Sequence, residues 1–68
     1  MLNTSKLRGI IAEKGYSQAQ VANKIGMTDR TFYRKMKEGV FGLDEAEKLI
    51  QLLDIEDPSS VFFAREVT

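Results

Sequence analysis

The chain has 68 residues, with ten Lys and Arg against ten Asp and Glu, a formal net charge of zero, and neither cysteine nor histidine. This length allows one small domain, and the missing residue types exclude disulfides, thiolate metal sites and imidazole acid–base chemistry. We therefore expect no bound metal, no cofactor and no enzymatic activity. No apolar run approaches the roughly 20 residues of a membrane span and no signal peptide is visible, so we expect no membrane association and a cytoplasmic location.

The first predicted helix covers residues 4–14. Its apolar residues recur at the i, i+3, i+4 spacing of a buried stripe, in Leu7, Ile10 and Ile11. Gly9 lies inside this helix, where glycine costs about 1 kcal/mol relative to alanine. We interpret Gly9 as a position that permits close packing against a neighbouring element.

Two short helices separated by a tight turn are predicted over residues 17–39, which read SQAQVANKIGMTDRTFYRKMKEG. Ser17 and Gln20 form a capping box that begins the first of them. Gly26 suits the left-handed position that ends this helix, and Thr28 can cap the next one at once. The second helix is predicted from residue 29 to residue 38 and ends at Gly39.

The second of these two helices has one apolar edge and one cationic edge. Phe32 and Met36 are four residues apart and therefore share a face, which we expect to be buried. The opposite side carries Arg30, Tyr33, Arg34 and Lys37. Such a helix is suited to contact an anionic partner.

A fourth helix is predicted over residues 43–53, with Leu43, Ala46, Leu49, Ile50 and Leu53 facing inward. Asp57 and Pro58 then predict the start of a short fifth helix that runs to about residue 63. Residues 64–68 are expected to form a C-terminal tail. No repeat or linker divides the chain, so residues 1–68 are predicted to form a single domain.

Adjacent aromatic residues near the C-terminus suggest self-association. Phe62 and Phe63 cannot both face one core from a short helix, so one of them is expected to be partly exposed. The predicted dimer interface comprises Leu52, Phe62, Phe63 and Val67.

Charge is distributed unequally along the chain. Residues 1–40 hold eight Lys and Arg against three Asp and Glu, a net charge of +5, whereas residues 41–68 hold two against seven, a net charge of −5. Electrostatic binding depends on the field at one face rather than on the total charge. The asymmetry therefore favours a polyanionic partner, and Lys6 and Arg8 are further candidates to border it.

The segments QAQVANKIGMTDRTFYRKMKEG, FGLDEAEKLIQLLDI and DPSSVFFA resemble the lambda-repressor-like helix-turn-helix family (Cro/repressor, XRE-type), especially its small phage and prophage members. The similarity covers about residues 4–63, and its most specific positions are Gln18, Ala22, Gly26 and Phe32. One departure is Lys35, which stands where many members have an apolar residue. The resemblance implies an all-α, compact five-helix bundle with the helix-turn-helix at helices two and three.

The resemblance also implies that the third helix lies in the major groove of DNA. The predicted base-contacting residues are Thr28, Asp29, Arg30, Tyr33 and Arg34. The predicted phosphate-contacting residues are Ser17, Gln18, Lys35, Lys37 and Gly39. Thr28 suits a phosphate or a thymine methyl group, and Tyr33 a phosphate or a sugar. Asp29 suits cytosine N4 or a purely structural role, such as orienting an arginine.

We therefore expect a sequence-specific DNA-binding transcriptional regulator of the Cro-like repressor type. Its partners would be a double-stranded DNA operator and a second copy of the chain, with no small-molecule ligand. The alternative is an antirepressor or adaptor that keeps this fold but binds another regulatory protein. Strong salt dependence of duplex binding would distinguish the first function from the second.

Overall fold

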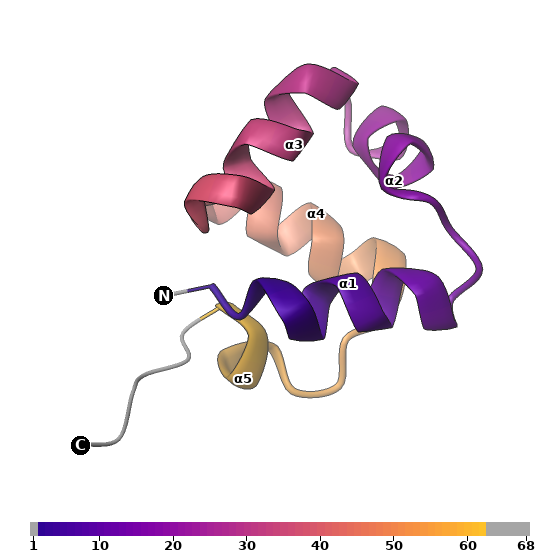
Figure 1. The fold of residues 1–68 in the computed structure, drawn as a ribbon. Coiled ribbons are helices and arrows are strands. Elements are labelled where there is room, and N and C mark those ends of the chain that lie inside the picture. The colour runs from indigo at the N-terminus through magenta and orange to yellow at the C-terminus, as the bar shows by residue number, and fades with distance from the viewer. Residues whose placement is uncertain (1, 63–68) are drawn as a thin grey trace.

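The structure is a computed structural model that describes residues 2–62 of the chain. Within that range the chain forms five helices and no strand (Figure 1). They are α1 (Thr4–Glu13), α2 (Gln18–Lys24), α3 (Asp29–Glu38), α4 (Leu43–Leu53) and α5 (Pro58–Phe62). The predicted all-α fold is confirmed, and α3 and α4 have the bounds expected from the sequence.

Short polar side chains begin the first three helices. Asn3 caps α1 by accepting a hydrogen bond from the backbone N–H three residues on, at 3.1 Å, and Thr28 caps α3 in the same way at 3.3 Å. At α2 the predicted capping box is complete: Ser17 Oγ accepts from the Gln20 N–H at 3.1 Å, and Gln20 Oε1 accepts from the Ser17 N–H at 2.8 Å. Because each pair of partners is only three residues apart, the sequence sets these helix starts locally.

A tight turn connects α2 to α3. Gly26 has a φ of +78°, a left-handed conformation in which a side chain would be strained. The N–H of the next residue, Met27, donates to the carbonyl of Ala22 at 2.9 Å and closes the end of α2. In Figure 1 the two helices follow one another at the top of the molecule. Residues 18–38 therefore form a helix-turn-helix.

All five helices contribute to one hydrophobic core. The largest fully buried side chains are Leu7, Val21, Phe32, Leu49, Leu53 and Val61. Burying each of them stabilises the fold by about 1.5–3 kcal/mol. The ring of Phe41 extends the core, with its centroid 5.5 Å from that of Phe32. Because Phe32 lies in the middle of α3, this packing fixes the rotation of α3 about its axis.

Polar contacts between distant segments hold α3 against the rest of the bundle. Thr4 Oγ1, at the start of α1, donates to the backbone carbonyl of Met36 at 3.2 Å. The Lys35 ammonium donates to both carboxylate oxygens of Glu45 on α4, each at 2.7 Å. The C-terminal half of α3 is therefore tied to two other helices.

Two packing predictions are wrong. Leu43 is 74 % exposed, because the buried stripe of α4 starts one turn later and its first residue lies at the rim of a surface hollow. A Cβ added at Gly9 would meet nothing within 4 Å, so this glycine permits no close contact. Phe62 is 8 % exposed and packs in the chain's own core, which is compatible with the expectation that one of the two adjacent phenylalanines faces the core.

Within residues 2–62, no helix is long and apolar enough to cross a membrane. In the same range no three His, Cys, Asp or Glu side chains are grouped so that they could hold a metal ion.

Candidate nucleic-acid interface

The outer face of α3 carries a stripe of long polar side chains. It consists of Arg30, Tyr33, Arg34 and Lys37, all of them exposed. Their numbers follow the i, i+3, i+4, i+7 pattern of one helix face. The opposite face is anchored by Phe32 and Met36, which are 0 % and 2 % exposed. The buried side chains therefore restrict rotation of α3 about its axis and keep the stripe facing solvent.

Within residues 2–62, no carboxylate forms an ion pair with the guanidinium group of Arg30 or Arg34. In the part of the chain that the structure describes, the one ion pair closer than 4.0 Å joins Lys35 to Glu45. An expected alternative role for Asp29, orienting an arginine, therefore has no ion pair to support it. Arginine presents five donors in a planar fork, which matches the edge of a guanine or a phosphate.

A hollow of about 590 Å³ borders the stripe on the side of α1 and α2. It is lined by Thr4, Ser5 and Arg8 from α1, Gln18 from α2, and Tyr33, Met36 and Lys37 from α3. The structure thus brings together three residues that the sequence predicted as DNA contacts: Gln18, Tyr33 and Lys37. It also adds Thr4 and Ser5, which were not predicted, and includes Arg8. The four-residue spacing of Thr4 and Arg8 indicates that they share a helix face, but only the fold shows that this face adjoins α3.

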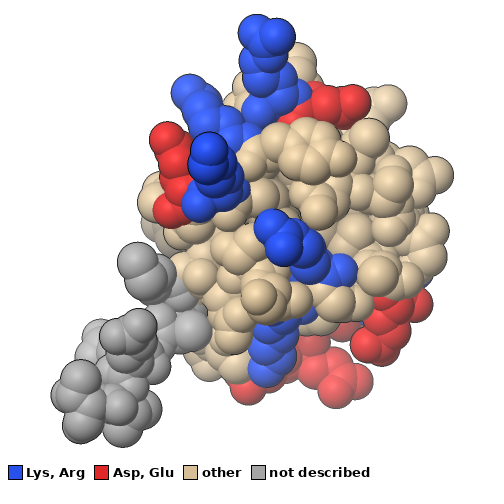
Figure 2. All heavy atoms as spheres, viewed as in Figure 1, with Lys and Arg blue, Asp and Glu red and all other residues tan. Residues whose placement is uncertain are grey.

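Basic side chains gather on this side of the molecule. Figure 2 shows Lys and Arg side chains over α3 and between α3 and α1, and acidic side chains mainly at the lower edge of the same view. Two acids interrupt the basic face, because Asp29 and Glu38 are the first and last residues of α3. The charge asymmetry along the chain therefore becomes an asymmetry between two sides of the fold.

Contrary to the expectation from the sequence, Lys35 is not part of this basic face. Its side chain is 24 % exposed and its ammonium is bound to Glu45. The bond from Lys35, together with one from the backbone N–H of Gly42, lowers the pKa of the Glu45 carboxyl below its ordinary value. The Lys35 ammonium and the Glu45 carboxylate neutralise each other, so Lys35 is not free to contact a phosphate. Its role is to join α3 to α4.

Gly39 is also engaged differently from the prediction. It ends α3 with a φ of +72°, and its N–H donates to the carbonyl of Lys35 at 2.8 Å. This N–H is therefore not free to donate to a phosphate. Ser17, in contrast, only accepts through its hydroxyl oxygen, from the N–H of Gln20, so its hydroxyl proton remains available.

The Thr28 hydroxyl both accepts from the Thr31 N–H and donates to Thr31 Oγ1 at 2.9 Å. With the hydroxyl proton used in this way, the methyl group is the part of Thr28 left for an outside contact. Of the two expected roles for Thr28, contact with a thymine methyl group is therefore the better supported.

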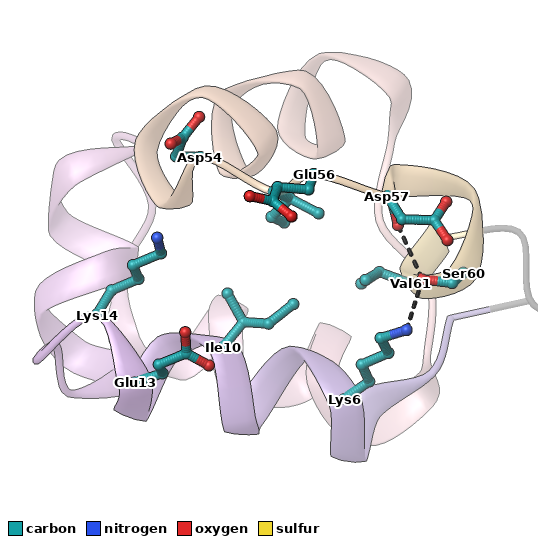
Figure 3. Close-up of a pocket in the computed structure, with 10 residues that line it drawn as sticks. Lys6, Ile10, Glu13, Lys14, Asp54, Glu56, Asp57, Ser60 and Val61 are labelled. Carbon is teal, nitrogen blue, oxygen red and sulfur yellow. Dashed lines mark hydrogen bonds between the residues drawn. The ribbon is translucent and has the colours of Figure 1, made fainter.

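Lys6 lies on the other side of α1 from the stripe. Its Nζ donates to Ser60 Oγ on α5 at 2.7 Å, and Ser60 Oγ in turn donates to the carbonyl oxygen of Asp57 at 2.9 Å (Figure 3). A hydrogen bond from the Ser59 hydroxyl is the main reason why the pKa of the Asp57 carboxyl lies below its ordinary value. Lys6 therefore ties α1 to α5 and does not line the hollow beside the stripe.

The predicted dimer interface receives little support from the structure. Leu52 is half-buried against the chain's own core, and Phe62 is buried in it. Phe63 and Val67 lie outside the described residues. These residues do not form an exposed apolar surface within residues 2–62.

The fold and the basic face together define a helix-turn-helix protein of the DNA-binding kind. Comparison with known families agrees with this class: the sequence profile described as "Bacterial regulatory protein, Fis family" matches residues 7–39, just under half of the chain. The match runs from α1 to the end of α3 and supports a DNA-binding transcriptional regulator. It does not extend to α4 and α5, nor does it support the lambda-repressor-like family in particular. The comparisons with curated proteins and with solved structures found no match.

Proposed function

We propose that the chain is a sequence-specific transcriptional repressor of the small phage or prophage Cro-like type, which inserts α3 into the major groove of an operator. It acts in the bacterial cytoplasm by occupying the operator and blocking polymerase. The single observation that carries this proposal is the pair of exposed guanidinium groups of Arg30 and Arg34, which form no ion pair with any described residue, on a helix anchored by its buried face.

The dimensions of α3 suit this role. The major groove is about 12 Å wide and admits one α-helix. α3 has ten residues and a continuous polar stripe at helical spacing. When the stripe faces the base pairs, the buried edge of α3 faces away from the DNA, so the core is not disturbed by binding.

Direct reading of bases is assigned to the N-terminal half of α3. Arg30 and Arg34 are one turn apart, and each can pair with O6 and N7 of a guanine. Tyr33 lies between them and contacts a sugar or a phosphate. Thr28 offers its methyl group to a thymine, and Asp29 accepts a hydrogen bond from cytosine N4 when it contacts DNA at all.

Contacts with the DNA backbone are assigned to the hollow beside the stripe. Arg8, Gln18 and Lys37 line that hollow and supply two charges and an amide. Ser17 precedes Gln18 and can donate its hydroxyl proton to the same strand. Such contacts fix the register of a protein on the duplex without reading sequence. Arg8 thus takes the place that the sequence assigned to Lys35.

The chain is proposed to bind its operator as a homodimer. A two-fold symmetric protein matches a palindromic operator, with equivalent helices in successive major grooves about 34 Å apart. Each subunit then reads one half-site.

Selection of bound duplexes from a random pool at two salt concentrations tests this function. We expect an enriched sequence, and an affinity that falls by orders of magnitude between low and moderate salt. Arg30→Ala and Arg34→Ala should each weaken binding to the enriched duplex by about 5- to 150-fold, the loss of one arginine–guanine pair. Circular dichroism should show an unchanged fold, because both side chains are exposed.

Lys14→Ala is the matched control. Lys14 is an exposed cation on the other side of α1, where it lines a separate hollow with Glu13, Asp54, Glu56 and Asp57 (Figure 3). Its removal changes the net charge equally but should barely affect binding. Equal losses of affinity in all three variants would mean that binding depends only on net charge. That result would contradict the proposal that α3 reads the base sequence. Failure to bind any duplex at low salt would favour the alternative function, an adaptor or antirepressor.

A further inference from the structure

The two arginines of the α3 stripe form a row with only two members. Arg30 and Arg34 are both exposed and lie one turn apart, which separates them by about 6 Å along α3 and by only about 40° around its axis. No earlier residue of α3 shares this row, because α3 begins at Asp29. The next position of the row, four residues after Arg34, is Glu38, whose carboxylate only accepts hydrogen bonds. The row therefore presents two guanidinium groups and then an acid.

This row is distinct from the edge of α3 that borders the hollow. The hollow is lined from α3 by Tyr33, Met36 and Lys37, and neither arginine belongs to its lining. Tyr33 lies about 60° around the helix from Arg30 on the side of the hollow, whereas Arg34 lies about 40° from Arg30 on the other side. Because the hollow is assigned to one DNA backbone, both arginines point past that backbone toward the base edges. Since they leave α3 from one edge, they reach bases of the same strand.

We infer that each operator half-site carries two guanines on one strand, in adjacent base pairs or with one base pair between them, and that each arginine reads one of them. This inference rests on the DNA-binding function proposed above and specifies the sequence that it recognises. Base pairs follow one another about every 3.4 Å, so the separation of about 6 Å along α3 spans at most two base-pair steps. When α3 crosses the groove at an angle, the same separation spans one step.

Guanine is the base that best suits two guanidinium groups in a row. Its major-groove edge presents two acceptors, O6 and N7, whereas adenine and thymine present one acceptor each and cytosine presents a donor. The planar fork of an arginine satisfies both acceptors of guanine at once. Within residues 2–62 no carboxylate pairs with either arginine, so neither fork must leave an internal partner to reach a base. Over another base, at least one charged donor loses its acceptor, which costs affinity.

Base analogues in the selected duplex test this assignment at the level of single atoms. The analogue 7-deazaguanine has a carbon in place of N7 and so removes one acceptor from the major-groove edge. At either guanine of the pair it should weaken binding of the wild type about 10-fold in fluorescence anisotropy, the loss of one hydrogen bond to a charged group. Inosine at the same positions is the matched control: it keeps O6 and N7 and lacks only the minor-groove amino group, so affinity should stay within about 2-fold.

Arginine variants assign each guanine to its side chain. Arg30→Ala should be insensitive to 7-deazaguanine at one guanine of the pair and keep the loss at the other, and Arg34→Ala should show the reverse pattern. Arg30→Lys and Arg34→Lys keep the charge, but lysine has no planar fork. Each lysine variant should therefore bind unselected DNA as the wild type does and prefer the selected duplex less. Circular dichroism verifies that all four variants are folded.

Two results would overturn this inference and leave the proposed function standing. One is an enriched half-site without two guanines inside three successive base pairs of one strand. The other is a loss from 7-deazaguanine that is the same in the wild type and in both alanine variants, because the arginines would then contact phosphates. A chain that enriches no sequence at either salt concentration would instead reject the proposed function, and this inference with it.

Discussion

Gly9 offers a sharp test of how the backbone of this fold determines stability. It lies in the interior of α1, it is exposed, and a Cβ added there meets nothing within 4 Å. Alanine is favoured over glycine in a helix interior by about 0.8–1 kcal/mol, and no steric clash opposes that gain here. For a domain of this size, 1 kcal/mol corresponds to about 4–8 °C in Tm. Gly9→Ala should therefore raise Tm by several degrees.

Gly26 provides the matched control, because a Cβ added there also meets nothing within 4 Å but the backbone has a φ of +78°. A left-handed conformation costs a residue with a side chain roughly 1–2 kcal/mol. Gly26→Ala should therefore lower Tm by about as much as Gly9→Ala raises it. Thermal and urea unfolding followed by circular dichroism measure both. A lower Tm for Gly9→Ala, or a change of the same sign in both variants, would refute the reasoning from helix conformation and open space.

Three further predictions concern packing, charge and binding. Phe32→Ala removes a side chain that is 0 % exposed and should cost about 3–5 kcal/mol in unfolding free energy, enough to leave a domain of this size largely unfolded by circular dichroism. Glu45→Gln should cost about 0.5–1 kcal/mol near neutral pH, because it removes the ion pair with Lys35. Since the folded pKa of Glu45 lies below its ordinary value of 4.5, this stabilisation is present above pH 4.5 and is lost as the pH falls through the folded pKa, so urea unfolding of wild type and variant should converge in acid. Lys37→Ala should weaken binding to all duplexes alike and reduce the slope of log affinity against log salt by about one in fluorescence anisotropy titrations; an unchanged slope would remove Lys37 from the phosphate contacts.

The sequence predicts this fold well because the signals that define it are short. The capping box of Ser17 and Gln20 spans three residues, and Gly26 and Gly39 end their helices by their own conformational freedom. The stripe on α3 is likewise visible in the sequence, since Phe32 and Met36 fix which face is buried. Local chemistry therefore predicts both the elements and the orientation of the proposed reading helix.

The sequence does not predict contacts between residues that are distant in the chain. Lys35 and Glu45 are ten residues apart, and Lys6 and Ser60 are 54 apart. Each lysine looks in the sequence like one more cation of the basic N-terminal half. Only the fold shows that one bonds to α4 and the other to α5, and that Arg8 lies beside the α3 stripe. The exposure of Leu43 is missed for the same reason: its periodicity is that of a buried residue, but no other element covers it.

The start of α1 is held by both the middle and the last helix, because Thr4 bonds to the Met36 carbonyl and the Asn3 N–H donates to the Val61 carbonyl at 2.7 Å. The second of these bonds joins α5 to the residue that caps α1, so the stretch of chain that it encloses includes α1 to α4 and most of α5. Removing α5 would take this support away from the segment with Thr4 and Arg8. A chain cut before residue 58 should therefore bind DNA more weakly than the chain with all five helices.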